Sequence, residues 1–239
     1  NFAQFFFWCS PPSFLALGAA YFIILLIYRQ QISGVNEKKS MAHMSPGQPF
    51  DKWQTTKGIV AIIVLVLLFF YSIPREFSAI GIAGVLLCSR KMKTRDIMGL
   101  VDWHLITLFC ALFVIIHGVA RAGFLDIVMN QLSFMGMDLH NLPVLTGMSV
   151  ILSNFFSNVP AVMVLIRFID PLVQTQWYTL AVSSTFAGNL FLLGSIANLI
   201  VVEQASYYDI KISFWQHAVV GIPVTLTSLM VLLGWLWVG

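Results

Sequence analysis

Four polar side chains grouped inside an apolar stretch are the first residues of this chain that could do chemistry. Ser153, Asn154, Ser157 and Asn158 lie close together, and Pro160 follows them. Hydroxyl and amide oxygens are ligands for a hard cation such as Na⁺, while amide N–H groups can donate hydrogen bonds to an anion. The stretch therefore predicts a binding site for a small ion.

A second polar stretch follows about thirty residues later, where two glycines interrupt an apolar region. Each glycine has a hydroxyl or amide side chain beside it, which is what a helix that unwinds inside a membrane needs. Unwound backbone offers carbonyl groups to a cation, and the N-terminus of the next half-helix offers N–H groups to an anion. The predicted binding residues here are Gly188, Asn189, Gly194, Ser195, Ala197 and Asn198. The alternative is that the glycines only allow helices to pack closely.

Carboxylates are missing from the segments that carry these polar residues. No Asp or Glu occurs within 103–125, 142–169 or 177–202, and Glu203 comes only after the last of them. A coupling ion would then be bound by neutral oxygens, and we expect Na⁺ at Ser157, Asn158, Ser195 and Asn198. The other option is that protons use groups outside this chain.

The histidines allow two further hypotheses. His104 and His117 lie on one apolar segment, with His217 at the edge of another, so a haem held by two histidines is one alternative. His117 by itself is either a helix-packing residue or a group linked to proton transfer. The sequence shows no zinc-protease, Ser/His/Asp or phosphate-loop motif. We therefore expect no enzyme, and no cofactor beyond a coupling Na⁺.

Composition decides where these residues must work. The chain has 239 residues, of which 59% are apolar and 10% charged, and its mean hydropathy is +0.86. Soluble domains carry about 25% charged residues. These values exclude a soluble domain and predict an all-α integral membrane protein. The net charge of +3 is too small to suggest a nucleic-acid partner.

Five apolar segments are candidates for membrane-spanning helices, since ~17 to 25 residues are needed to cross the hydrocarbon core. They are residues 9–28, 58–73, 77–89, 103–119 and 213–238. A sixth region, 177–205, is long enough but contains the two glycine interruptions. It predicts a discontinuous transmembrane helix.

Residues 142–169 differ from all of these because they are apolar at both ends and polar at the centre. The arms 143–152 and 161–169 have about ten residues each, so each reaches only ~15 Å as a helix, half of the hydrocarbon core. The pattern favours a re-entrant helical hairpin that enters from the outer side. The alternative is one continuous helix kinked at Pro160.

Basic residues give the orientation, because Lys and Arg accumulate on the cytoplasmic side. With loops 29–57 and 90–101 inside, ten basic residues lie inside and three outside. This predicts a protein of the bacterial inner, or cell, membrane. It also predicts a cytoplasmic linker at 29–57, scaffold helices at 58–119 and an outer interfacial segment at 120–141. Residues 142–239 then form the transport part.

Three motifs resemble the second half of the ion transporter superfamily, in its arsenite and anion permease branch with citrate transporter-like relatives. They are V-D-W-H-L-I-T-L-F at 101–109, S-N-F-F-S-N-V-P-A at 153–161 and G-N-L-F-L-L-G-S-I-A-N-L-I-V-V-E at 188–203. The resemblance implies two inverted repeats, each with a hairpin and a broken helix. It also implies an elevator movement against a dimerising scaffold, and hence a homodimer. Residues 1–28 resemble the last helix of the first repeat, whose hairpin and broken helix lie outside these residues.

The motifs also bear on the substrate. Carboxylate carriers of the superfamily usually have Ser-Asn-Thr at the tip and a Thr-Pro-Pro-Asn-like break, whereas this chain has Ser157-Asn158-Val159 and Ser195-Ile196-Ala197-Asn198. The resemblance thus implies cation-coupled secondary transport, with Na⁺ or H⁺, of a small inorganic anion such as arsenite, or else of a carboxylate such as citrate. A sodium/proton antiporter, a passive channel and a haem-bearing redox protein are the alternatives.

Overall fold

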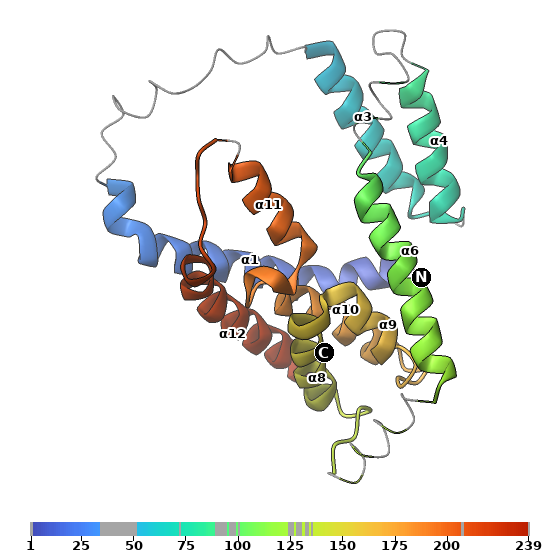
Figure 1. Cartoon of the computed structure of the whole chain (residues 1–239), viewed down its shortest axis with the longest axis vertical. Coiled ribbons are helices and arrows are strands. Elements are labelled where there is room, and N and C mark those ends of the chain that lie inside the picture. The colour runs from blue at the N-terminus through green and yellow to red at the C-terminus, as the bar shows by residue number, and fades with distance from the viewer. Residues whose placement is uncertain are drawn as a thin grey trace. The chain divides into compact units, whose positions relative to one another are not determined.

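The computed structural model consists of helices and connecting segments (Figure 1). It describes residues 2–33, 52–71, 73–88, 95, 99, 101–123, 127, 131, 134, 136–206 and 208–238, and this part of the chain contains no strand. The predicted all-α membrane class is confirmed. Most of the predicted loops 29–57 and 90–101, and part of the interfacial segment 120–141, lie outside the described residues.

The helices are α1 (Phe2–Ser33), α3 (Lys52–Leu68), α4 (Arg75–Leu87), α6 (Trp103–Arg121), α8 (Leu142–Phe156), α9 (Asn158–Leu165), α10 (Gln174–Ala187), the 3₁₀ turn η2 (Leu192–Gly194), α11 (Ile196–Ser206) and α12 (Phe214–Val238). Three of them are long and apolar enough to cross a membrane, over Phe2–Gln30, Lys52–Phe69 and Phe214–Val238. The span predicted at 77–89 is shorter, because α4 has 13 residues and reaches ~20 Å.

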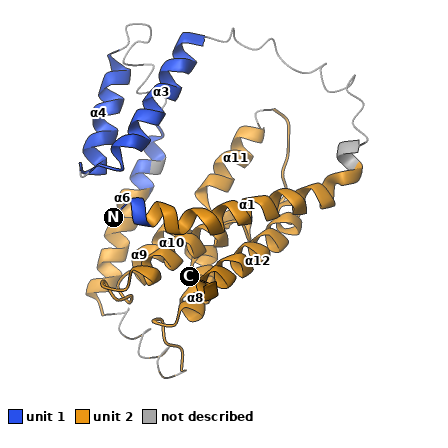
Figure 2. Cartoon of the chain, turned by 180° about the vertical axis from the view of Figure 1, so that it is seen from behind, with its two compact units in different colours: residues 1–4, 34–108 blue, residues 5–33, 109–239 orange. Residues whose placement is uncertain are grey.

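The chain divides into two compact units, which Figure 2 colours separately. The first comprises residues 1–4 and 34–108, and the second comprises residues 5–33 and 109–239. The predicted scaffold, 58–119, falls across this division. In the first unit α3 and α4 are packed together, and the ammonium group of Lys57 on α3 lies 3.4 Å from the carbonyl oxygen of Leu86 near the end of α4.

The second unit holds both predicted polar stretches and has two buried apolar clusters. One cluster contains Leu139, Leu145, Leu165, Ile169 and Leu180 and joins α8, α9 and α10. The other contains Cys9, Ala16, Val182, Phe186 and Leu232 and joins α1, α10 and α12. Because α10 contributes to both, it is the element against which the hairpin and the last helix are positioned.

A capping box sets the start of α12. The hydroxyl of Ser213 accepts a hydrogen bond from the backbone N–H of Gln216 at 3.2 Å, and the side-chain oxygen of Gln216 accepts one from the N–H of Ser213 at 2.8 Å. This reciprocal pair satisfies two donors at the helix N-terminus. It marks the residue at which α12 begins.

Candidate functional site

The segment 142–169 is two helices and not one. The break is at Ser157, whose backbone has φ 71° and ψ 160°, and the buried cluster contains Leu145 of α8 together with Leu165 of α9. In a continuous helix these two leucines would be ~30 Å apart. The alternative of a single kinked helix is therefore wrong. Entry of the hairpin into the membrane from one side stays a prediction.

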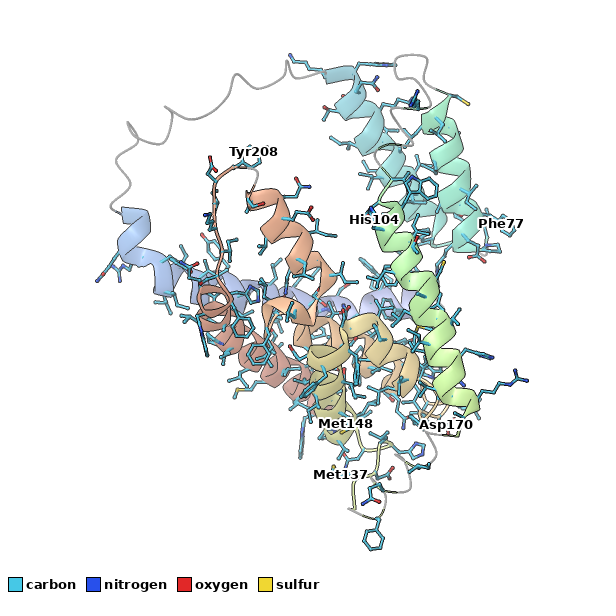
Figure 3. The ribbon with its side chains drawn as sticks, viewed as in Figure 1. Phe77, His104, Met137, Met148, Asp170 and Tyr208 are labelled. Atoms are coloured by element: carbon cyan, nitrogen blue, oxygen red, sulfur yellow. The ribbon has the colours of Figure 1, made fainter. Side chains whose placement is uncertain are left out.

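The two ends of this hairpin are fastened to each other by Gln176 on α10. The side-chain oxygen of Gln176 accepts a hydrogen bond from the backbone N–H of Asp170 at 2.8 Å, and its amide nitrogen donates to the carbonyl oxygen of His140 at 3.2 Å. Figure 3 labels Asp170 in the loop after α9. Since one buried side chain reaches both residues, the hairpin begins and ends at the same end of α10.

The tip is more helical than the sequence predicts. Ser153 and Asn154 belong to the last turn of α8, where the amide nitrogen of Asn154 donates to the carbonyl oxygen of Val150 at 2.9 Å. Pro160 lies in the first turn of α9, where the missing N–H has no helical partner to lose. The non-helical part is thus reduced to Ser157.

Ser153 lies in a seam of buried hydroxyl groups. Its hydroxyl, and those of Thr146, Ser149 and Thr179, are buried and have no hydrogen-bond partner among the described residues. The first three share the buried side of α8, and Thr179 is on the buried side of α10. A bound ion could contact Ser153 only if the packing of α8 against α10 opened.

The discontinuous helix is present and is broken where the glycines predict. α10 ends at Ala187, a turn and the short η2 follow, Ser195 is extended, and α11 begins at Ile196. The last carbonyl groups of α10 and those of the turn have no helical partner. Buried carbonyl groups must find donors elsewhere.

Side chains from three elements supply donors to these carbonyl oxygens. The hydrogen bonds run from Asn154 of the hairpin to Ala187 (3.1 Å), from Asn198 of α11 to Gly188 (2.7 Å), from His217 of α12 to Asn189 (3.2 Å) and from Thr225 of α12 to Phe186 (3.5 Å). The sequence predicts carbonyl groups open to a cation. In the structure each already accepts a side-chain donor, and the oxygens of Phe186 and Ala187 also accept the backbone N–H groups of Asn189 and Leu190 at 3.1 Å, which uses both of their lone pairs. The oxygens of Gly188 and Asn189 have one donor each among the described residues.

Both glycines allow close contacts at the break. A Cβ on Gly194 would lie 2.6 Å from the side-chain oxygen of Asn154, and one on Gly188 would lie 3.0 Å from the Cβ of Ser195. The tip of the hairpin is thereby packed directly against the break. The side-chain oxygen of Asn154 is buried in this contact and accepts no hydrogen bond from the described residues.

The predicted binding residues fall into two groups. Asn154, Gly188, Gly194, Ser195 and Asn198 converge on the break through the contacts above. Ser157 and Asn158 lie at the turn of the hairpin, where the hydroxyl of Ser157 is 3.4 Å from the side-chain oxygen of Asn158. That oxygen also accepts a hydrogen bond from the N–H of Val159.

The side chains of Asn189, Ala197 and His117 do not take part in this convergence, although the carbonyl group of Asn189 belongs to the break. Asn189 and Ala197 have exposed side chains, and His117 is exposed on α6. No hydrogen bond within the described part of the chain joins Ser157 or Asn158 to Ser195 or Asn198. A Na⁺ ion bound by these four residues therefore remains a prediction. It requires the turn of the hairpin at Ser157 and the break before α11 to approach each other.

The sequence reasoning missed the contribution of α12. His217, Gly221 and Thr225 are spaced four residues apart, so they share one helix face. This spacing is visible in the sequence. The contacts of this face are not visible there, because its hydrogen-bond partners lie 28 and 39 residues earlier in the chain.

An all-helical membrane protein whose helical hairpin is packed on a discontinuous helix belongs to the class of membrane transport proteins. The comparison with known families agrees. Residues 1–187 match the citrate transporter family, and the chain belongs to this family.

Several curated relatives carry transporter names. A Dictyostelium discoideum protein named transporter arsB is 35% identical over 182 residues, which are 72% of this chain and 32% of that protein. The silicon efflux transporter LSI3 of rice, Oryza sativa, is 31% identical over 70% of this chain and 37% of its own length. A 46 kDa membrane protein of Mycobacterium leprae is 27% identical over 78% of this chain and 47% of its own length. The chain thus spans a third to a half of these relatives, and no solved structure matches it.

Proposed function

We propose that this chain supplies one half of the ion pathway of a cation-coupled secondary transporter for a small anion. The observation that carries the proposal is the contact of the hairpin tip with the broken helix, where Asn154 bridges Ala187 and Gly194. Irregular backbone is tolerated inside a membrane protein only where it is buried in protein or lines an aqueous cavity. Interrupting a helix inside the protein leaves backbone groups that need other partners, and here α8, α11 and α12 supply them. A helix with a purely structural role would not need such an interruption.

The anion would bind at helix N-termini. α9 begins immediately after the turn of the hairpin, and α11 begins immediately after the break. The first N–H groups of each helix lack partners within it, and the helix dipole adds partial positive charge there. Two such N-termini, with the amide groups of Asn158 and Asn198 beside them, suit a small anion.

For the substrate we favour an inorganic oxyanion, such as arsenite, over a carboxylate such as citrate. The tip sequence Ser157-Asn158-Val159 supports this choice, and two relatives are named transporter arsB and silicon efflux transporter. The name of the family supports the carboxylate. The coupling ion is Na⁺ or H⁺, and the movement is an elevator motion of residues 142–239, with the first-repeat half of the site outside these residues.

The two asparagines provide the test. Asn158→Ala removes an amide whose oxygen accepts hydrogen bonds, among the described residues, only from its neighbours Ser157 and Val159, whereas Asn198→Ala removes the 2.7 Å hydrogen bond that joins α11 to the carbonyl oxygen of Gly188. A buried hydrogen bond or ligand is worth roughly 1 to 3 kcal/mol, so each change should raise the half-saturation constant for the anion or the cation by about five- to hundredfold. Asn198→Ala should in addition lower the melting temperature.

The measurement is uptake of arsenite, phosphate and citrate by the full transporter in proteoliposomes, with and without a Na⁺ or a proton gradient. Rates are normalised to folded protein. Asn130→Ala, in the predicted interfacial segment, is the matched control and should leave uptake unchanged. Wild-type half-saturation constants in both site variants would remove the ion site from these residues.

A further inference from the structure

One face of α12 packs against the break in the discontinuous helix. His217, Gly221 and Thr225 lie on this face, and all three contact backbone of residues 186–190. The family match ends at residue 187, before α12 begins. No binding role for α12 follows from the sequence motifs either.

His217 and Gly221 act on the same peptide group. The Nε2 atom of His217 lies 3.2 Å from the carbonyl oxygen of Asn189. A Cβ added to Gly221 would clash with that same oxygen and would lie 2.8 Å from the carbonyl oxygen of Leu190 and 3.3 Å from Nε2 of His217. The backbone of α12 at Gly221 therefore packs directly against the turn at Asn189 and Leu190, and the imidazole of His217 lies beside this contact.

The contact with a carbonyl oxygen requires a proton on Nε2 of His217. A carbonyl oxygen only accepts hydrogen bonds, so the contact is a hydrogen bond when Nε2 carries a proton. Both the Nε2–H neutral tautomer and the imidazolium satisfy this requirement. The contact thus needs a donor at the position of Nε2, and it does not need a charge.

We propose that His217 is a positioning residue that fixes the carbonyl group of Asn189, with Gly221 providing the close seat, so that α12 sets the geometry of the break between α10 and α11. The effect on ion binding rests on the proposed function above. The direction of the Asn189 carbonyl determines how the chain continues through η2 to Ser195, where α11 begins. The N-terminus of α11 is consequently aimed by α12.

Two substitutions of His217 separate a donor from mere bulk. His217→Gln keeps an N–H donor at similar reach, and His217→Leu keeps the volume without a donor. In the full transporter, His217→Leu should speed backbone hydrogen exchange at residues 188–195 and raise the half-saturation constant for the transported ion by roughly five- to hundredfold. His217→Gln should restore most of both values.

Gly221 has a matched control on the same helix. Gly221→Ala should produce the same loss as His217→Leu, because the added methyl group meets the carbonyl oxygens of the break. Gly234→Ala adds the same methyl group where nothing lies within 4 Å, and it should behave as wild type. Equal changes of hydrogen exchange and of the half-saturation constant in both alanine variants would contradict a specific close contact at Gly221.

The outcomes also distinguish this proposal from the proposed function. If the wild type transports none of the ions tested, the proposed function fails, and exchange at 188–195 alone decides whether His217 fixes the break. Unchanged exchange in His217→Leu overturns the proposal. Faster exchange with an unchanged half-saturation constant in an active transporter also overturns it, because the break would then not need this fixed geometry to bind the ion.

Discussion

At the scale of single residues, Ser157 is the position where backbone geometry and function meet. Its φ of 71° and ψ of 160° fall in a region that only glycine occupies without strain. A side chain kept in such a region costs of order 1 to 3 kcal/mol, and such strain is concentrated at binding and catalytic sites. A serine retained here is consistent with a hydroxyl group that serves a purpose.

Glycine and alanine at this position separate strain from chemistry. Both substitutions remove the hydroxyl group, but only Ser157→Gly removes the strain. Ser157→Gly should therefore be more stable than Ser157→Ala by about 1 to 2 kcal/mol, after allowance for the larger entropy that glycine loses on folding. Thermal unfolding of the purified transporter measures the difference as a few degrees. An alanine variant as stable as the glycine variant would show that Ser157 is not strained.

The same pair tests the predicted ligand role of Ser157. If its hydroxyl group binds the ion, both variants should show a half-saturation constant raised by roughly five- to hundredfold. Equal uptake by the wild type and both variants would remove Ser157 from the site while leaving the strain intact.

At the scale of elements, the hairpin is defined by its base as much as by its tip. Gln176 ties His140 and Asp170 together, so the chain enters and leaves at one place. The two backbone groups that Gln176 reaches at this base are thereby satisfied within the protein. A membrane would then meet the hairpin from that side only.

Cysteine labelling tests the re-entrant arrangement. Asn141→Cys and Leu172→Cys place thiols at the two ends of the hairpin, in a background without Cys9, Cys88 and Cys110. Position 172 is suited to this because the side chain of Leu172 is 89% exposed. Both thiols should react with a membrane-impermeant maleimide added from outside. Labelling of one from each side would establish a transmembrane passage between them and contradict the re-entrant hairpin.

At the scale of the whole molecule, the first unit has the surface expected of a membrane scaffold. α3 has no buried residue, and the only buried residue of α4 is Ser78. Large exposed apolar surfaces mark contact with lipid or with another protein. The resemblance to the superfamily implies that part of this surface is covered by a second copy.

Cross-linking between copies tests the dimer. Ile62→Cys on α3 and Phe155→Cys near the tip of the hairpin are both exposed apolar positions, at 63% and 80%. Disulfide-linked dimers should form through position 62 and not through position 155 when the transporter is oxidised in lipid. Particles that remain monomeric at every exposed position of α3 and α4 in lipid would contradict a dimer formed by this unit.

Much of the architecture follows from patterns that are local in the sequence. The apolar fraction determines that the chain is a membrane protein, because so much apolar surface cannot be buried in a domain of this size. Gly188 and Gly194 mark the position of the break in the sequence, and the polar residues before Pro160 mark the turn of the hairpin. The family follows from the same motifs, and its match to residues 1–187 confirms it.

The partners of the break were decided only by the tertiary structure. The sequence shows that Asn154, Asn198 and His217 carry amide or imidazole groups, but it does not show which carbonyl oxygen each one reaches. Those pairings join residues 10 to 33 positions apart, and they depend on how α8, α11 and α12 pack around α10. The reason is physical: helix breaks are local events, whereas the donors that satisfy a buried carbonyl group are selected by packing in three dimensions.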